Sequence, residues 1–217
     1  MNYLAHVFLA RGSTDMTIGA LLGDFAKGSA AAAYPDGIRS GIALHRLIDR
    51  YTDDHRIVCA SRALIDAPRR RFAGIVVDVF YDHFLARHWG RFADTPLTEF
   101  TRRVYATLAP YRADFPERLR RVLPRMIAED WLGSYGRIDA VDAALKGIAR
   151  RFKYYDRARV LENAVNDLEE RYAQFECDFL EFFPELRRYV DSTLPDPNLS
   201  MDAVAGRVGR LAVPMPK

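Results

Sequence analysis

The chain has 217 residues, 49% of them apolar and 28% charged, and this composition excludes a disordered protein. Its formal net charge of +3 is too small for a general polyanion binder, so we expect no nucleic-acid partner. No run approaches the roughly 18 apolar residues needed to span a bilayer. The first residues are a poor signal peptide, and Cys59 and Cys177 indicate reduced core residues. We therefore expect a cytoplasmic protein without a membrane segment.

Helical periodicity covers nearly the whole chain, and neither an Asn-Gly hairpin signal nor sustained period-2 alternation occurs. The first helices are predicted at 2–11, 14–27 (capped by Ser13 or Thr14), 38–52, 54–66 and 69–89. A loop is expected between the second and third helices. The fifth helix is apolar on almost every side, which indicates that it is buried. Four prolines then predict breaks between short helices: Pro96, Pro110, Pro116 and Pro124.

The second half of the chain carries a regular apolar seam, expected to lie on one packed helix. Its residues are spaced alternately by four and three: Leu161, Val165, Leu168, Tyr172, Phe175, Phe179 and Phe182. Pro184 should kink or end this helix, and residues 193–217 look like a loosely attached tail. We therefore predict one compact all-α domain over residues 1–192, with any site within residues 1–90.

Titratable residues in apolar sequence are concentrated in the first part of the chain. The last of the five histidines is His88. The fifth helix carries Asp78, Asp82 and His83 inside its apolar run, although charged side chains are rarely buried unless they are paired or bind a metal. A salt bridge to an arginine is the alternative interpretation.

The third predicted helix carries a similar group on one face. His45, Asp49 and Asp53 are one helical turn apart, so that imidazole and carboxylate could bind one divalent cation. Asp24 ends LLGDF, and His6 lies inside YLAHVFLA. Singly, each of these residues is as well explained by a surface, helix-end or core role. Together, on four helices, they predict a shared site.

Mixed imidazole and carboxylate ligands suit Mn²⁺, Mg²⁺ or Fe²⁺ and argue against a closed thiolate zinc site. The chain has no glycine-rich phosphate loop, no G-x-S-x-G elbow and no H-E-x-x-H segment. Hydrolysis by a metal-activated water is therefore the simplest chemistry.

Four sequence blocks, in this order and spacing, resemble the acyl carrier protein phosphodiesterases: MNYLAHVFLA, IGALLGDFAKG, GIALHRLIDRYTDDH and RRRFAGIVVDVFYDHFLARHW. DWLGSY, LKGIARRF and FLEFFPEL are similar to the family's C-terminal half, so the resemblance covers residues 1–190. It implies an HD-domain-like helical bundle, a Mn²⁺-dependent site and acyl carrier protein as substrate. The reaction would hydrolyse the phosphodiester between 4′-phosphopantetheine and the carrier's serine.

The resemblance also implies the site residues. It places Asp24, His45, Asp49, Asp78 and His83 on the family's motifs, with His6 in the opening Leu-Ala-His. The metal ligands would come from His6, Asp24, His45, Asp49, Asp78, Asp82 and His83, with Asp24, His45 and Asp78 as the core. The residues expected to take part in catalysis are Asp24, His45, Arg46, Asp49, Asp78 and His83.

Arg46 would stabilise the charge that develops on the phosphate, and His83 or His6 would protonate the departing serine oxygen. The chain departs from the His-Asp signature of the HD phosphohydrolases, because Arg46 follows His45 and only the reversed pair Asp82-His83 is adjacent.

Arginine accounts for 28 of the 32 basic residues. Because acyl carrier proteins are strongly acidic, the resemblance implies a basic docking surface. Arg69, Arg70 and Arg71 lead directly into the fifth helix and are the best-placed candidates, with residues 118–121 and 150–151 as alternatives. Each cluster is equally compatible with a solvated helix face.

Two other functions stay open. An HD-type phosphohydrolase acting on a nucleotide or another small phosphate ester would not need a carrier protein. A non-catalytic helical binding module would pair its buried acids with arginines and bind no metal. The oligomeric state is also open, because the seam at 161–182 could lie within one chain or between two.

Overall fold

The computed structural model describes residues 1–11, 13–26, 28–152 and 155–194, and all regular structure in these ranges is helical. The predicted all-α class and single domain are confirmed. Within the same ranges, no helix combines the length and apolar character needed to cross a membrane.

The first five α-helices follow the predicted order. They are α1 (Tyr3–Leu9), α2 (Thr14–Leu22), α3 (Asp36–Asp54), α4 (Arg56–Leu64) and α5 (Ala73–Arg87). Helix α2 is shorter than predicted, and Ser13 is its N-cap without a side-chain hydrogen bond. The predicted loop contains a 3₁₀ helix, Gly28–Ala33, and a second one, Ala67–Phe72, precedes α5.

Prolines divide the middle of the chain only in part as predicted. The helices are α6 (Leu97–Leu108), α7 (Glu117–Ala128), α8 (Trp131–Ser134) and α9 (Ile138–Ala149). Pro96 and Pro116 are the N-caps of α6 and α7, where a missing N–H is tolerated. The predicted break at Pro124 is wrong, because α7 continues through it. The ring lies on the exposed face, opposite buried residues such as Leu119 and Leu123 that hold the helix in place.

The predicted seam is divided among several elements instead of one helix. They are α10 (Tyr155–Ala158), a 3₁₀ helix (Arg159–Asn163), α11 (Val165–Glu170) and α12 (Tyr172–Thr193). The helix breaks at Arg171, where φ is −124°. Pro184 does not end α12. The predicted tail lies outside the described residues from 195 onward, so the domain boundary at residue 192 stays a prediction.

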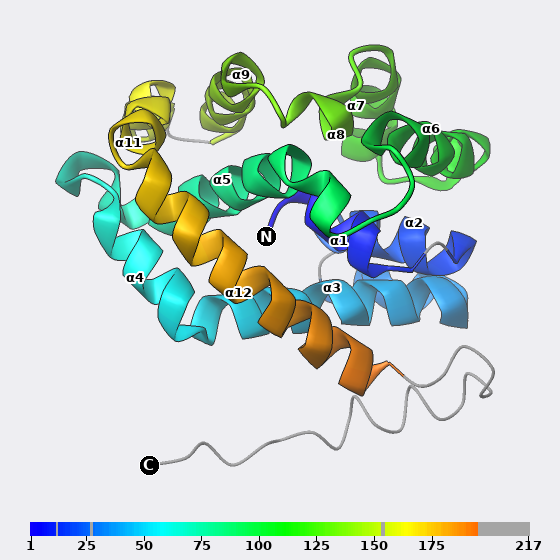
Figure 1. Ribbon diagram of the computed structural model, residues 1–217. Coiled ribbons are helices and arrows are strands. Elements are labelled where there is room, and N and C mark those ends of the chain that lie inside the picture. The colour runs from blue at the N-terminus through cyan, green and yellow to red at the C-terminus, as the bar shows by residue number, and fades with distance from the viewer. Residues whose placement is uncertain (12, 27, 153–154, 195–217) are drawn as a thin grey trace.

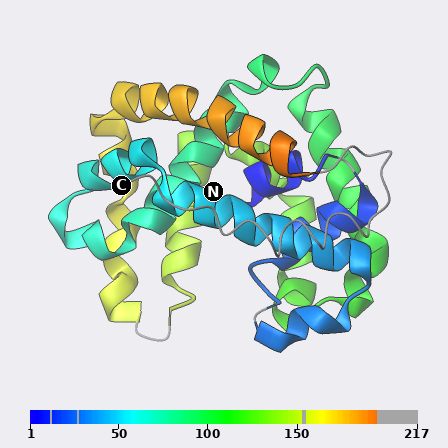
Figure 2. The ribbon, with the colours of Figure 1, turned by 90° about the horizontal axis from the view of Figure 1, so that it is seen from below.

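Helix α5 runs through the middle of the molecule, with α9 above it and α3 and α4 below it in the view of Figure 1. Helices α1, α4, α9 and α12 contact it. Aromatic rings join α5 to α12: Phe80 lies 5.2 Å from Phe175, and Tyr81 lies 5.6 Å from Phe179, centroid to centroid. These seam residues therefore pack within the chain. Helix α12 also contacts α3, beside which it runs in Figure 2.

Candidate metal centre

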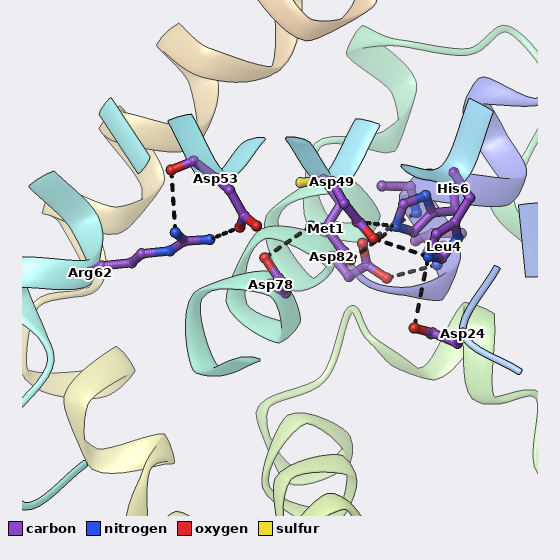
Figure 3. Close-up of polar contacts among 11 residues, drawn as sticks. Met1, Leu4, His6, Asp24, Asp49, Asp53, Arg62, Asp78 and Asp82 are labelled. Atoms are coloured by element: carbon purple, nitrogen blue, oxygen red, sulfur yellow. Dashed lines mark hydrogen bonds and ion pairs between the residues drawn. The ribbon is translucent and has the colours of Figure 1, made fainter. Parts of the chain in front are cut away.

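Three side chains from two helices converge at one point. His6 comes from α1, and His45 and Asp49 come from successive turns of α3; one ligand atom from each lies within 4.8 Å of the others. The Nε2 atoms of His6 and His45 each lie 3.1 Å from a different oxygen of Asp49 (Figure 3). The two imidazoles stack with centroids 3.7 Å apart. This group, the His-His-Asp cluster, is a site that could hold a metal ion.

Glycine allows α2 to approach α3 closely enough to build this cluster. A Cβ at Gly19 would lie 2.2 Å from the carbonyl oxygen of Ile38, and one at Gly41 would lie 2.6 Å from that of Met16. At Gly23, a Cβ would lie 2.1 Å from Cγ of His45. Real Cβ atoms do not make such contacts, so any larger residue would push the helices apart or displace the imidazole.

A backbone hydrogen bond sets the orientation of His45. Its Nδ1–H donates to the carbonyl oxygen of Ala20 at 2.7 Å, so Nε2 is the atom directed at Asp49. Such a bond is typical of a metal-binding histidine, because it orients the ring and fixes the nitrogen offered to the metal.

The charges of the cluster are strongly coupled. Burial lowers the pKa of His45, but the hydrogen bond and charge of Asp49 outweigh burial and raise it. Burial and the charge of His45 lower the pKa of His6. Although burial acts in the opposite direction, the two histidines hold the pKa of Asp49 far below its usual range. The carboxylate is thus ionised and faces two imidazoles, and the Nδ1 of His6 is buried without a hydrogen-bond partner. The donor set fits a divalent cation in place of the proton between His45 and Asp49.

Asp24 links the cluster to an open cavity. Its Oδ1 lies 3.7 Å from Nε2 of His45, just beyond the cluster, and its side chain is 48% exposed. It lines a cavity of about 340 Å³, called the inner cavity below, together with Asp78. Asp24 therefore lies between the inner cavity and His45 of the cluster.

The other residues that line the inner cavity include Tyr3, Arg118 and Arg151. Neither arginine forms an ion pair with any residue that the structure describes; Arg118 lies over the ring of Phe25 and Arg151 over that of Trp131. Burial and the charge of Asp24 raise the pKa of Tyr3, which outweighs the lowering by the arginines and keeps its phenol protonated.

Sequence reasoning did not assign these three residues to the site. In the sequence, Arg118 and Arg151 belong to basic clusters, and Tyr3 belongs to the first block of the family resemblance. Nothing in the local sequence indicates that α7 and the end of α9 reach Asp24.

Asp78 and Asp82 hold the start of the chain and are not members of the His-His-Asp cluster. Asp78 accepts a hydrogen bond from the Met1 amine at 2.9 Å. Asp82 accepts backbone N–H bonds from Leu4 and Ala5, at 2.7 and 3.2 Å, and thus caps α1 (Figure 3). Burial outweighs these bonds and raises the pKa of Asp82 to about 7. Sequence analysis did not foresee this cap because the carboxylate comes from another helix.

The structure places the other predicted residues outside the cluster as well. His83 has both ring nitrogens engaged, Nδ1 with the carbonyl oxygen of Tyr135 at 2.8 Å and Nε2 with the hydroxyl of Tyr172 at 2.9 Å. Arg46 is exposed and donates to the carbonyl oxygen of Ala26 at 3.1 Å. Asp53 pairs with Arg62 instead of continuing the stripe of His45 and Asp49 (Figure 3).

The predicted docking arginines already have partners within the chain. Arg69 is only 12% exposed and pairs with Asp167, which is fully buried, at 2.5 Å. The Nε of Arg70 donates to the carbonyl oxygen of Ile65 at 2.9 Å, and Arg71 donates to the backbone of Arg157. These contacts tie the start of α5 to neighbouring segments, so Arg69 in particular has little free charge for a partner.

Comparison with known proteins identifies the family. Residues 1–186 match the family model described as acyl carrier protein phosphodiesterase. The chain is similar to proteins of that name from Klebsiella pneumoniae (strain ATCC 700721), 34% identical over 193 residues covering 88% of this chain and 98% of the relative, and from Enterobacter sp. (strain 638), 35% identical over 187 residues covering 86% and 95%. No solved structure matches the chain, so its likeness to the HD phosphohydrolases stays a prediction. The chain belongs to the acyl carrier protein phosphodiesterase family.

Proposed function

We propose that this protein hydrolyses the phosphodiester between 4′-phosphopantetheine and the serine of holo-acyl carrier protein, with Mn²⁺ held by the His-His-Asp cluster and Asp24. The observation that carries the proposal is this cluster, next to which Asp24 lines the inner cavity, in a chain of this family. The relatives' name supplies the substrate.

A divalent cation bound there would lower the pKa of a coordinated water and polarise a phosphoryl oxygen. The chain's own residues prepare the site. His45 is held by Ala20, and Asp49 brings negative charge between the two imidazoles. Asp24 faces both the cluster and the inner cavity, where the phosphodiester would lie.

Arg118 and Arg151 are the arginines that we assign to the phosphate, in place of Arg46. Both line the inner cavity beside Asp24, and neither is neutralised by a carboxylate among the described residues. Two cations on one wall would stabilise the charge that grows on the phosphoryl oxygens. Tyr3, which stays protonated on the same wall, could donate a proton to the departing serine oxygen.

Asp82 and Asp78 are positioning residues in this proposal. Asp82 caps α1, which carries His6, and Asp78 holds Met1 at the edge of the inner cavity. His83 is proposed to support the packing of α5 against α8 and α12, because both of its nitrogens bond there.

Mass spectrometry of the carrier protein tests the proposal. Metal-free enzyme is incubated with holo-acyl carrier protein, with or without Mn²⁺, and the carrier should lose the mass of 4′-phosphopantetheine only with Mn²⁺. His45→Gln should abolish this loss and also the binding of Mn²⁺ measured by calorimetry. His88→Gln is the matched control, since His88 is a partly buried histidine that pairs with Glu176, outside the cluster.

A carrier that keeps its full mass with wild-type enzyme and Mn²⁺ would refute the proposed reaction. Full activity of His45→Gln would remove the cluster from the mechanism. Faster turnover of a nucleotide diester than of holo-acyl carrier protein would favour the small-ester alternative.

A further inference from the structure

A second cavity continues the inner cavity along the protein surface. This groove of about 730 Å³, called the outer groove below, is lined by residues of α7, α8 and α9. Asn2, Tyr3, Ile148 and Arg151 line both spaces, so the outer groove and the inner cavity share a wall. A partner seated in the outer groove would thus have a direct path to Asp24.

The outer groove carries a net positive charge. Six basic side chains line it against only two carboxylates, those of Glu129 and Asp139. The basic residues are Arg121, Arg125, Arg137, Lys146, Arg150 and Arg151. Glu117 and Asp142, which pair with Arg121 and Lys146, reduce this excess of four positive charges to two. Two charges in one groove are a large share of the chain's net charge of +3, and they create a local positive potential there.

Some of this charge is uncompensated. Four of the six basic residues pair with a nearby acid: Arg121, Arg125, Arg137 and Lys146. Arg150 and Arg151 form no ion pair with any residue in the described part of the chain. Arg150 is also exposed, so its charge is available to a partner.

The floor of the outer groove suits a protein helix better than a nucleic acid. Ala140, Ala143, Ala144 and Gly147 line it at helical spacing along α9, and a Cβ at Gly147 would meet no atom within 4 Å. Trp131 adds an aromatic side chain, with the guanidinium groups of Arg125 and Arg151 over its ring. An aromatic side chain together with arginines is typical of protein–protein interfaces. The small residues of α9 leave room for the backbone of a neighbouring helix to approach closely.

We propose that the outer groove is the docking surface for the protein substrate, and that it receives a helix that presents several carboxylates. This inference rests on the proposed function, since it assigns where the carrier protein binds relative to the metal centre. It replaces the predicted dock at residues 69–71, where Arg69 is already paired with a buried carboxylate.

The fluorescence of Trp131 provides a binding assay that does not depend on catalysis. The chain has two tryptophans, and Trp89 is buried, whereas Trp131 lines the outer groove. The protein is titrated with a tryptophan-free acyl carrier protein whose serine is replaced by alanine, so that no reaction occurs. We expect saturable quenching that weakens as salt rises from about 25 to 150 mM, and that disappears in Trp131→Phe.

Charge reversal at Arg150 separates docking from chemistry. Arg150 lines only the outer groove and pairs with no described carboxylate, so its replacement leaves no buried charge unpaired. Arg150→Glu should raise the Kd of the carrier and the KM for holo-acyl carrier protein about tenfold, with kcat changed less than twofold. Mn²⁺-dependent hydrolysis of bis(p-nitrophenyl) phosphate should not change. Arg102→Glu is the matched control: Arg102 is exposed on α6 and lines neither cavity.

The outcomes are distinct. If the wild type is active, and if Arg150→Glu and Arg102→Glu have the same Kd and KM for the carrier, the outer groove is not the docking surface. The proposed function would then stay intact. Quenching by an RNA oligomer at 150 mM salt, without quenching by the carrier, would also overturn the outer groove as the docking surface. An inactive wild type that still binds the carrier through Arg150 would refute the proposed reaction and support the dock.

Discussion

Gly23→Ala is the substitution that most sharply tests how the fold holds His45. Gly23 has φ −51° and ψ −38°, an ordinary helical conformation that alanine also adopts. Any effect must therefore come from the added methyl group. That methyl would lie 2.1 Å from Cγ of His45, whereas ordinary van der Waals contact begins at 3.4 Å, so the imidazole or α2 must move by about 1.3 Å.

The magnitude follows from the confinement of the ring. His45 is 3% exposed and stacks on His6, so it has little room to yield. Overpacking of this kind typically costs about 1–3 kcal/mol, which lowers the Tm of a chain of this size by roughly 2–12 °C. Metal ligands tolerate displacements of only about 0.2 Å. We therefore expect the affinity for Mn²⁺ to fall by about 100-fold or more.

Calorimetry measures both effects, by thermal unfolding of the metal-free protein and by titration with Mn²⁺. Gly147→Ala is the matched control: it also adds a methyl group to a helical glycine, but no atom lies within 4 Å, so stability should stay level or rise by up to about 1 kcal/mol. An unchanged Tm and Mn²⁺ affinity in Gly23→Ala would refute the steric reasoning. A lower Tm with unchanged affinity would show that His45 is not a ligand.

Three further predictions concern stability and are checked by urea denaturation of the metal-free protein. Asp167→Asn leaves Arg69 with Asp66 but without its fully buried partner, and should lower the free energy of unfolding by about 1.5–3 kcal/mol; a loss below about 0.5 kcal/mol would contradict a structural role for the pair. Burial raises the pKa of Asp82 from 3.8 to about 7, so the folded chain keeps a proton that the unfolded chain has lost, and the stability present below pH 3.8 is lost as pH rises towards 7. Between about pH 4 and 8 the free energy of unfolding of the wild type should fall by up to roughly 4 kcal/mol more than that of Asp82→Asn. Parallel plots of the two free energies against pH would refute this sign. Phe179→Ala removes a fully buried ring and should lower the free energy of unfolding by about 3–5 kcal/mol. Phe152→Ala should lower it by only about 1 kcal/mol, because that ring is 37% exposed and packs edge-on against Phe72; similar losses at both positions would contradict the assigned core.

The helical class and the order of the first five helices could be predicted because they depend on local periodicity. The continuous apolar run of α5 correctly indicated a buried central helix, with Phe80 and Phe84 fully buried. The prediction that the apolar seam lies on a single helix was wrong, although Phe175 and Phe179 are buried in the core as expected. Spacing predicts which residues share a face, but it does not show where the backbone breaks, as at Arg171.

The sequence predicted which residue types form the candidate site, but not which individual residues meet there. His45 and Asp49 lie one turn apart on one helix, so their proximity follows from helix geometry alone. Asp82 and His83 share a helix with buried apolar residues in the same way, yet their partners are backbone groups and a tyrosine far along the chain. A buried polar side chain must be satisfied, and only the packing decides whether a metal, a helix end or a hydroxyl satisfies it.

The sequence by itself determined that this chain is a helical protein of its family, and that histidine and aspartate are concentrated in its first helices. The tertiary structure decided which of them meet. Gly19 and Gly41 let α2 and α3 come into contact, which brings Ala20 and Asp24 to His45. The arrangement of α7, α8 and α9 beside Tyr3 creates a cationic groove that shares a wall with the cavity lined by Asp24. Both features depend on contacts between helices, which periodicity within a single helix does not encode.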